Sequence, residues 1–98
     1  MTTKENILST LQAHKPELNN LGVHSIGLFG SYVRDEQSDS SDIDILIDFI
    51  PEKENFDNLM ALNDYIETLF KNEKLDIVTK NGLSPHIGPF ILKEVVYA

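Results

Sequence analysis

The sequence feature that most constrains this chain is a stretch of eight residues in which polar and apolar side chains alternate. From Asp42 to Phe49, the odd-numbered positions hold three isoleucines and a phenylalanine, and three of the four even-numbered positions hold aspartate. Successive side chains of a β-strand point to opposite faces of a sheet, so this alternation predicts a strand with one buried face. The aspartates then lie on the other face, where a cleft can form.

The segments before this strand predict a helix and a first strand. Thr2 and Glu5 have capping-box spacing ahead of an apolar helical face, and Pro16 is expected to end that helix. Residues 24–29 predict a short strand closed by Gly30, because glycine favours turns. A short helical turn and a loop are expected between these two strands.

The segments after it predict a helix, a strand and a second helix. Residues 55–71 place apolar side chains at helical spacing, and residues 75–79 predict a third strand. The tail, residues 86–98, predicts a helix with Pro89 in its first turn, although its end could equally be extended. The element order predicts an α/β (α+β) fold, with a small three-stranded mixed sheet flanked by helices.

Length and charge narrow the classes of function. A chain of 98 residues is expected to form one domain over residues 1–98. Its net charge of −8 repels nucleic acid, so a bound nucleotide would need divalent cations to neutralise the site. The chain lacks cysteine, a secretion signal and an apolar run of membrane-spanning length. We therefore expect a cytoplasmic protein that contacts neither membranes nor nucleic acid directly.

Three aspartates are the candidate catalytic and metal-binding residues. Asp42 and Asp44 leave the same face of the predicted strand, with their Cα atoms roughly 7 Å apart. If the strand at 75–79 lies parallel and adjacent, with the helix at 55–71 as the crossover, Asp76 falls beside them. Three such carboxylates repel unless they are protonated or bind divalent metal. Two Mg²⁺ ions are the natural guests, and Asp76 could also accept the proton of an incoming hydroxyl.

Gly30 and Ser31 are the candidate phosphate-binding residues. A glycine after a strand lets backbone N–H groups approach a phosphate, and a serine hydroxyl adds a donor. For this turn to meet Asp42, the first two strands should run antiparallel. Each feature also has an ordinary explanation, since Asp42 and Asp44 could end a loop, Asp76 could be an exposed strand residue, and Gly30-Ser31 could be a simple turn. The spacing between them favours one site.

Together these residues resemble those of a known family. Gly30-Ser31, then ten residues, then Asp42-Ile43-Asp44, with a later strand acid at Asp76, is similar to the polymerase-beta nucleotidyltransferase superfamily. The length is similar to that of its minimal nucleotidyltransferases. The resemblance implies the nucleotidyltransferase fold, metals on the three aspartates and ATP phosphates at Gly30-Ser31. Arg34 also looks family-like and could bind phosphate, but it could equally pair with a neighbouring acid.

The resemblance also implies a reaction and a partner. Many such proteins are antitoxins of helical HEPN-domain toxins, which they bind and to which they add AMP on a tyrosine hydroxyl. A hydroxyl of a small molecule as acceptor and a binding-only antitoxin with an inactive site remain alternatives. The apolar tail, with Tyr32 and Val33, could offer an exposed surface to this partner or to a second copy of the chain.

Overall fold

The structure, a computed structural model that describes residues 2–98, is built on a mixed sheet with the strand order β3-β2-β1-β4. Its strands are β1 (Val23–Phe29), β2 (Ile43–Phe49), β3 (Leu75–Thr79) and β4 (Val96–Tyr97). β2 pairs antiparallel with β1 and parallel with β3, and β4 pairs antiparallel with β1. The predicted mixed sheet is confirmed, but it has four strands rather than three, because the end of the tail is extended and pairs with Gly27 and Leu28.

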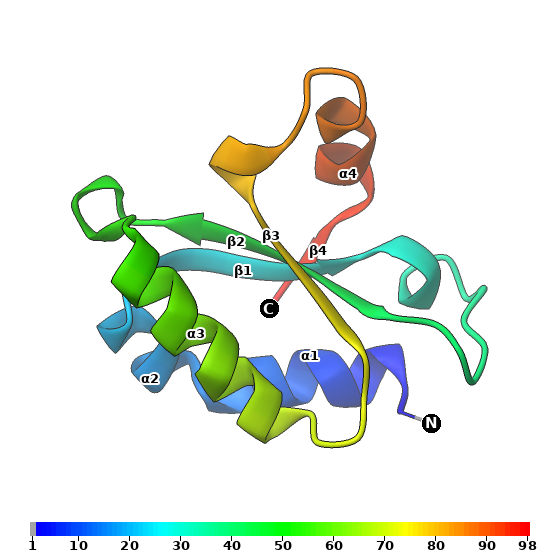
Figure 1. Cartoon of the computed structure of the whole chain (residues 1–98). Coiled ribbons are helices and arrows are strands. Elements are labelled where there is room, and N and C mark those ends of the chain that lie inside the picture. Colours follow the sequence, from blue (N-terminus) through cyan, green and yellow to red (C-terminus); the bar gives the residue numbers. More distant parts are fainter. Residues whose placement is uncertain (1) are drawn as a thin grey trace.

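Helices cover both faces of the sheet (Figure 1). The helices are α1 (Lys4–Ala13), α2 (Lys15–Asn20), α3 (Phe56–Leu69) and α4 (Gly88–Glu94). The first three lie on one face and α4 lies on the other, while α3 connects the parallel strands β2 and β3. None of the helices within residues 2–98 is both long and apolar enough to cross a membrane.

The helix boundaries correct two details of the sequence analysis. The hydroxyl of Thr3 accepts from the N–H of Asn6 at 3.1 Å, so Thr3 caps α1, and the predicted capping box of Thr2 and Glu5 is wrong by one residue. The first helix ends at Ala13, before Pro16 as expected, but a further helix that the sequence analysis did not predict, α2, begins at Lys15 and has Pro16 in its first turn. A proline is tolerated there because the first N–H groups of a helix have no partner within the helix.

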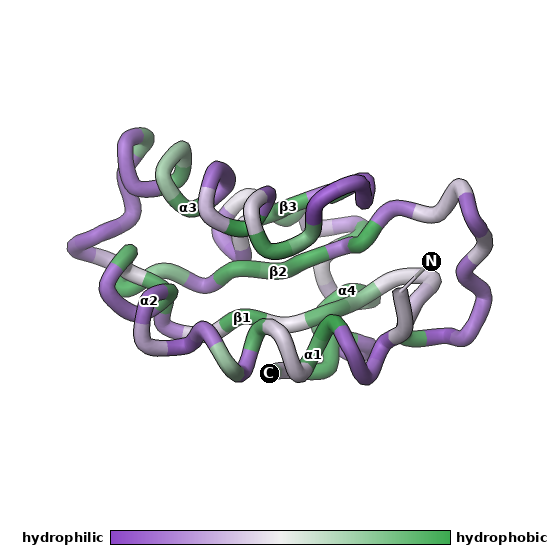
Figure 2. The backbone as a smooth tube through the Cα atoms, turned by 90° about the horizontal axis from the view of Figure 1, so that it is seen from below, coloured by the Kyte–Doolittle hydropathy of each residue, from purple (hydrophilic) through white to green (hydrophobic). Residues whose placement is uncertain are grey.

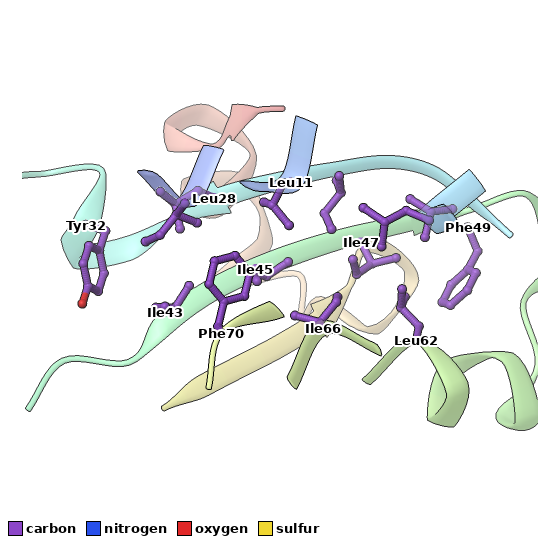
Figure 3. Packing of buried hydrophobic residues seen from close by; sticks show 14 residues of the cluster. Leu11, Leu28, Tyr32, Ile43, Ile45, Ile47, Phe49, Leu62, Ile66 and Phe70 are labelled. Carbon is purple, nitrogen blue, oxygen red and sulfur yellow. The ribbon is translucent and has the colours of Figure 1, made fainter. Parts of the chain in front are cut away.

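The main core lies between the sheet and the three helices on one face. The odd-numbered side chains of β2 are buried in it, as the alternation predicts. Figure 3 shows Ile43 beside Phe70, and Ile45 and Ile47 near Ile66 of α3. Tyr32 also belongs to this core with only 1% of its surface exposed. Its expected place on an exposed rim is therefore wrong.

A smaller cluster lies under α4 on the opposite face. Phe29, Leu46 and Ile91 are its buried members. α4 thus covers part of the face that carries the even-numbered residues of β2. Figure 2 shows hydrophobic segments along β1 and β2 in the middle of the molecule and a mostly hydrophilic connection between them.

Candidate active site

The pairing of three strands brings the predicted acids and the glycine turn to one place. Asp44 lies opposite Asp76 in the parallel ladder of β2 and β3. Asp44 also lies opposite Phe29, the residue before Gly30, in the antiparallel ladder of β1 and β2. The two strand orientations expected from the sequence are therefore confirmed. Asp42, two residues before Asp44 along the chain, precedes the start of β2.

The three acids differ in exposure, and the pKa of Asp44 is raised. Asp42 and Asp76 are exposed, whereas Asp44 is half-buried. Burial raises the pKa of Asp44 to about 6, and the charges of Asp76 and Asp42 add to this rise, while Arg34 opposes it. A negative charge on Asp44 at neutral pH is therefore unfavourable in this site. A bound cation would remove that penalty.

Gly30 is fixed by its contact with Asp44. Its φ angle is +81°, which L-residues with a side chain rarely adopt. A Cβ atom at this position would overlap Oδ2 of Asp44. The turn from Gly30 to Tyr32 is a short 3-10 helix, in which the carbonyl of Gly30 accepts from the N–H of Val33 at 3.1 Å. The backbone of the turn thus packs directly against the half-buried carboxylate.

Glu94, which the sequence analysis missed, closes the other side of this turn. The N–H of Gly30 donates to Oε1 of Glu94 at 2.6 Å. Nη1 of Arg34 donates to both oxygens of the same carboxylate at 3.0 Å. Its only sequence signal is that Glu94 and Lys93 are the charged residues of an otherwise apolar tail.

Arg34 has two acidic partners. In addition to Glu94, its Nε atom donates to Oε1 of Glu36 at 2.8 Å. Arg34 thus pairs with acidic residues, which was one of its two expected roles. One partner, Glu36, is near in the sequence and the other, Glu94, is distant. The two donors at this point, the amide of Gly30 and the guanidinium of Arg34, both bind an anionic group.

These residues border a cleft of about 310 Å³. Its lining combines charged groups with apolar ones from the turn, β2 and α4: Phe29, Gly30, Arg34, Asp44, Ile87, Phe90, Ile91 and Glu94. Asp44 therefore faces a space that a small molecule can enter.

The acids do not form a closed protein cage for a metal. Within residues 2–98, no three side chains of His, Cys, Asp or Glu are grouped so that they could hold an ion. Mg²⁺ commonly binds one or two carboxylates together with water and substrate phosphates. The oxygen ligands of Asp42, Asp44 and Asp76 fit this open mode of binding, in which the substrate completes the coordination.

Similarity to a known family and to known proteins extends over nearly the whole chain. The family described as Polymerase beta, Nucleotidyltransferase matches residues 5–97. A protein of Thermococcus cleftensis named protein adenylyltransferase MntA is 46% identical over 100 residues, which cover 99% of this chain and 97% of that protein.

Solved structures show the same fold. A protein provisionally named a minimal nucleotidyltransferase superposes with a TM-score of 0.80 at 26% identity, covering 97% of this chain and 95% of that one. A chain of the mutant toxin-antitoxin MntA-HpeT superposes with a TM-score of 0.60 at 18% identity, covering 98% of this chain and 71% of that one. At that identity the second likeness concerns the fold alone.

Replacement of Gly30 by alanine is expected to destabilise the fold by about 1–3 kcal/mol, because the positive φ is strained and the new methyl group overlaps Asp44. Urea unfolding measures the loss. Gly88→Ala is the control, since Gly88 does not have a positive φ and the nearest atom to a Cβ there, Cβ of Leu83, is 3.2 Å away. The double variant Gly30→Ala/Asp44→Ala should lose less stability than the sum of the single variants, and strict additivity would contradict the overlap.

Asp44 is also expected to make the stability of the metal-free protein depend on pH. Its folded pKa, about 6, lies above its ordinary value of 3.8. Protonated Asp44 is therefore favoured by folding. Its contribution to the free energy of unfolding is full below about pH 4 and is lost as the pH rises through about 6. Asp44→Asn should raise the melting temperature in EDTA more at about pH 8 than at about pH 4. Thermal unfolding of both proteins measures this, and an equal difference at both pH values would contradict it.

Proposed function

Because this chain belongs to the polymerase beta nucleotidyltransferase family, we propose that it transfers AMP from ATP to a hydroxyl group of a partner protein. The relative from Thermococcus cleftensis is named protein adenylyltransferase MntA and matches along nearly its whole length. The observation that carries the proposal is the row of Asp44 and Asp76 on adjacent strands beside the Gly30 turn. The whole of residues 1–98 acts as one nucleotidyltransferase domain.

Asp42, Asp44 and Asp76 would hold the divalent cations, two Mg²⁺ ions in this proposal. Oxygen ligands suit Mg²⁺, and burial, together with the charges of Asp76 and Asp42, raises the pKa of Asp44, a penalty on the carboxylate that bound cations would relieve. When bound, Mg²⁺ shields the triphosphate and favours ionisation of the attacking hydroxyl.

The reaction forms a bond between the acceptor oxygen and the α-phosphorus of ATP. The bond from this phosphorus to the oxygen that bridges to the β-phosphate breaks, and pyrophosphate leaves. Asp76 accepts the proton of the acceptor hydroxyl, since it is exposed and neighbours Asp44 across the ladder. The exposed position of Asp76 leaves room for an acceptor that belongs to another molecule.

Gly30, Ser31 and Arg34 would bind the phosphates of ATP. The amide of Gly30 and the guanidinium of Arg34 hold the carboxylate of Glu94, and these contacts support a role for both donors in binding an anion. A phosphate bound at these two donors would take the place of the Glu94 carboxylate. The half-buried Ser31, the next residue of the turn, would add its hydroxyl.

A HEPN-domain toxin is the partner that we propose, with this chain as its antitoxin in the cytoplasm. The name MntA is shared by the relative from Thermococcus cleftensis and by the toxin-antitoxin MntA-HpeT, which has the same fold. The net charge of −8 argues against a nucleic-acid acceptor. Leu92 and Tyr97, exposed by 41% and 50%, give the tail apolar surface for this partner or for a second copy of the chain.

Asp42→Ala and Asp44→Ala are each expected to reduce AMP transfer by about 100-fold or more while the protein stays folded, because each removes a ligand of the cations. Transfer of radiolabel from α-labelled ATP to the partner protein measures this. Asp48→Ala is the matched control for Asp44→Ala, since Asp48 also lies on β2 and is also half-buried. Wild-type rates in both site variants would contradict the assignment.

The same assay separates the proposal from its alternatives. Label on a small molecule, with none on the protein partner, would indicate a small-molecule acceptor. A stable complex without any label on either would indicate an antitoxin that acts by binding alone.

ATP with Mg²⁺ is expected to raise the melting temperature of the protein, and ATP in EDTA far less, because the acidic site cannot accept a triphosphate without neutralisation. Thermal unfolding at matched ATP concentrations measures both shifts. The variant Asp42→Ala/Asp44→Ala is the control and should lose most of the shift with Mg²⁺. Equal shifts with and without Mg²⁺ would contradict the metal-binding role of the three aspartates.

A further inference from the structure

The cleft beside Asp44 is polar at one end and apolar at the other. Its polar end is formed by Gly30, Arg34, Asp44 and Glu94. Its other lining residues are all apolar, but Phe29 pairs with Asp44 across the β1–β2 ladder and Ile91 packs against Phe29. Ile87 and Phe90, near the start of α4, therefore form the apolar end of the cleft. A nucleotide has the same division, because its phosphates are charged whereas its base is flat and has an apolar face.

α4 sets the distance between the two ends. Ile87, the N-cap of α4, and Phe90, Ile91 and Glu94 follow one another at helical spacing, so they share one face of the helix. Glu94 is seven positions after Ile87, which corresponds to roughly 10 Å along a helix. Phe90 lies about 6 Å from Glu94 by the same measure. The cleft therefore extends along the whole of α4.

The two side chains at the apolar end are unusually exposed for large apolar residues. Phe90 is 72% exposed and Ile87 is 55% exposed, whereas Ile91, on the same face, is only 8% exposed. Ile91 is buried against Phe29 and Leu46, and its packing anchors α4 to the sheet. Phe90 and Ile87 thus remain free to contact a molecule in the cleft while the helix itself is held in place.

Glu94 shows where the anionic part of a ligand would bind. Its carboxylate receives three hydrogen bonds from the amide of Gly30 and the guanidinium of Arg34. A phosphate that replaces this carboxylate is attached, within one nucleotide, to a base that can reach the apolar end of the same cleft. Aromatic side chains are effective platforms for bases because every base has a π-face.

We propose that Ile87 and Phe90 form the nucleobase-binding wall of the ATP site, with the base stacked on the ring of Phe90. This inference rests on the proposed nucleotidyltransferase function and specifies how its substrate is held. The apolar side chains at this end carry no hydrogen-bonding groups, so the wall recognises the face of a base rather than its edge. ATP and GTP should therefore bind with similar affinity, because both offer a purine face.

The test compares Mg-ATP with Mg-tripolyphosphate, which has the phosphates but no base, by isothermal titration calorimetry. Phe90→Ala is expected to weaken the binding of Mg-ATP by roughly 5- to 100-fold and to leave Mg-tripolyphosphate unchanged. Ile87→Ala should act in the same direction. Phe56→Ala is the matched control, because Phe56 of α3 is 73% exposed and does not line the cleft.

Several results would overturn the proposal. Phe90→Ala could weaken both ligands equally or neither, or wild-type protein could bind both ligands with equal affinity. Loss of association with the protein partner, with Mg-ATP binding intact, would instead make Phe90 part of a protein-docking surface. Wild-type protein that binds neither ligand would overturn the proposed function itself, and the nucleobase wall with it.

Discussion

The site depends on the alternation of side chains in β2. Burial of Ile43, Ile45 and Ile47 against the helices stabilises the fold by about 1.5–3 kcal/mol for each side chain. The pleat then places Asp44 on the opposite face, where it meets Asp76 and the Gly30 turn. A shift of register by one residue would move the isoleucines out of the core, so the packing of one face fixes the chemistry of the other.

Because of this alternation, several carboxylates lie close together around Asp44 in the folded protein. The pKa of Asp44 rises because Asp44 is half-buried next to other acids, and Glu94 adds a further carboxylate nearby. Arg34 offsets part of this charge, but Glu36 shares its guanidinium. The remaining negative charge lies beside an open cleft, which suits a cation-bound nucleotide better than any neutral ligand.

Local patterns predicted β1, β2, β3, α3, α4 and the meeting of Asp44 with Asp76, because periodicity and a parallel crossover determine these features. Other features depend on distant partners. Val96–Tyr97 is too short to be recognised as a strand without its pairing to β1. Glu94 has no local pattern that links it to Gly30, since their contact depends on how α4 packs over Phe29 and Leu46. The helix α2 was missed because Pro16 was taken only as a signal that ends a helix, whereas a proline can also lie in the first turn of the next one.

The hydrogen bond between Gly30 and Glu94 joins residues that are 64 positions apart in the sequence. The free energy of closing a loop of this length rises only slowly with its length, by roughly 0.6 kcal/mol for each doubling. Folding must nevertheless bring β1, β2 and α4 together before this bond can form, and contacts of such long range slow folding. The final shape of the anion-binding turn therefore depends on the docking of α4, the last helix of the chain, onto the sheet.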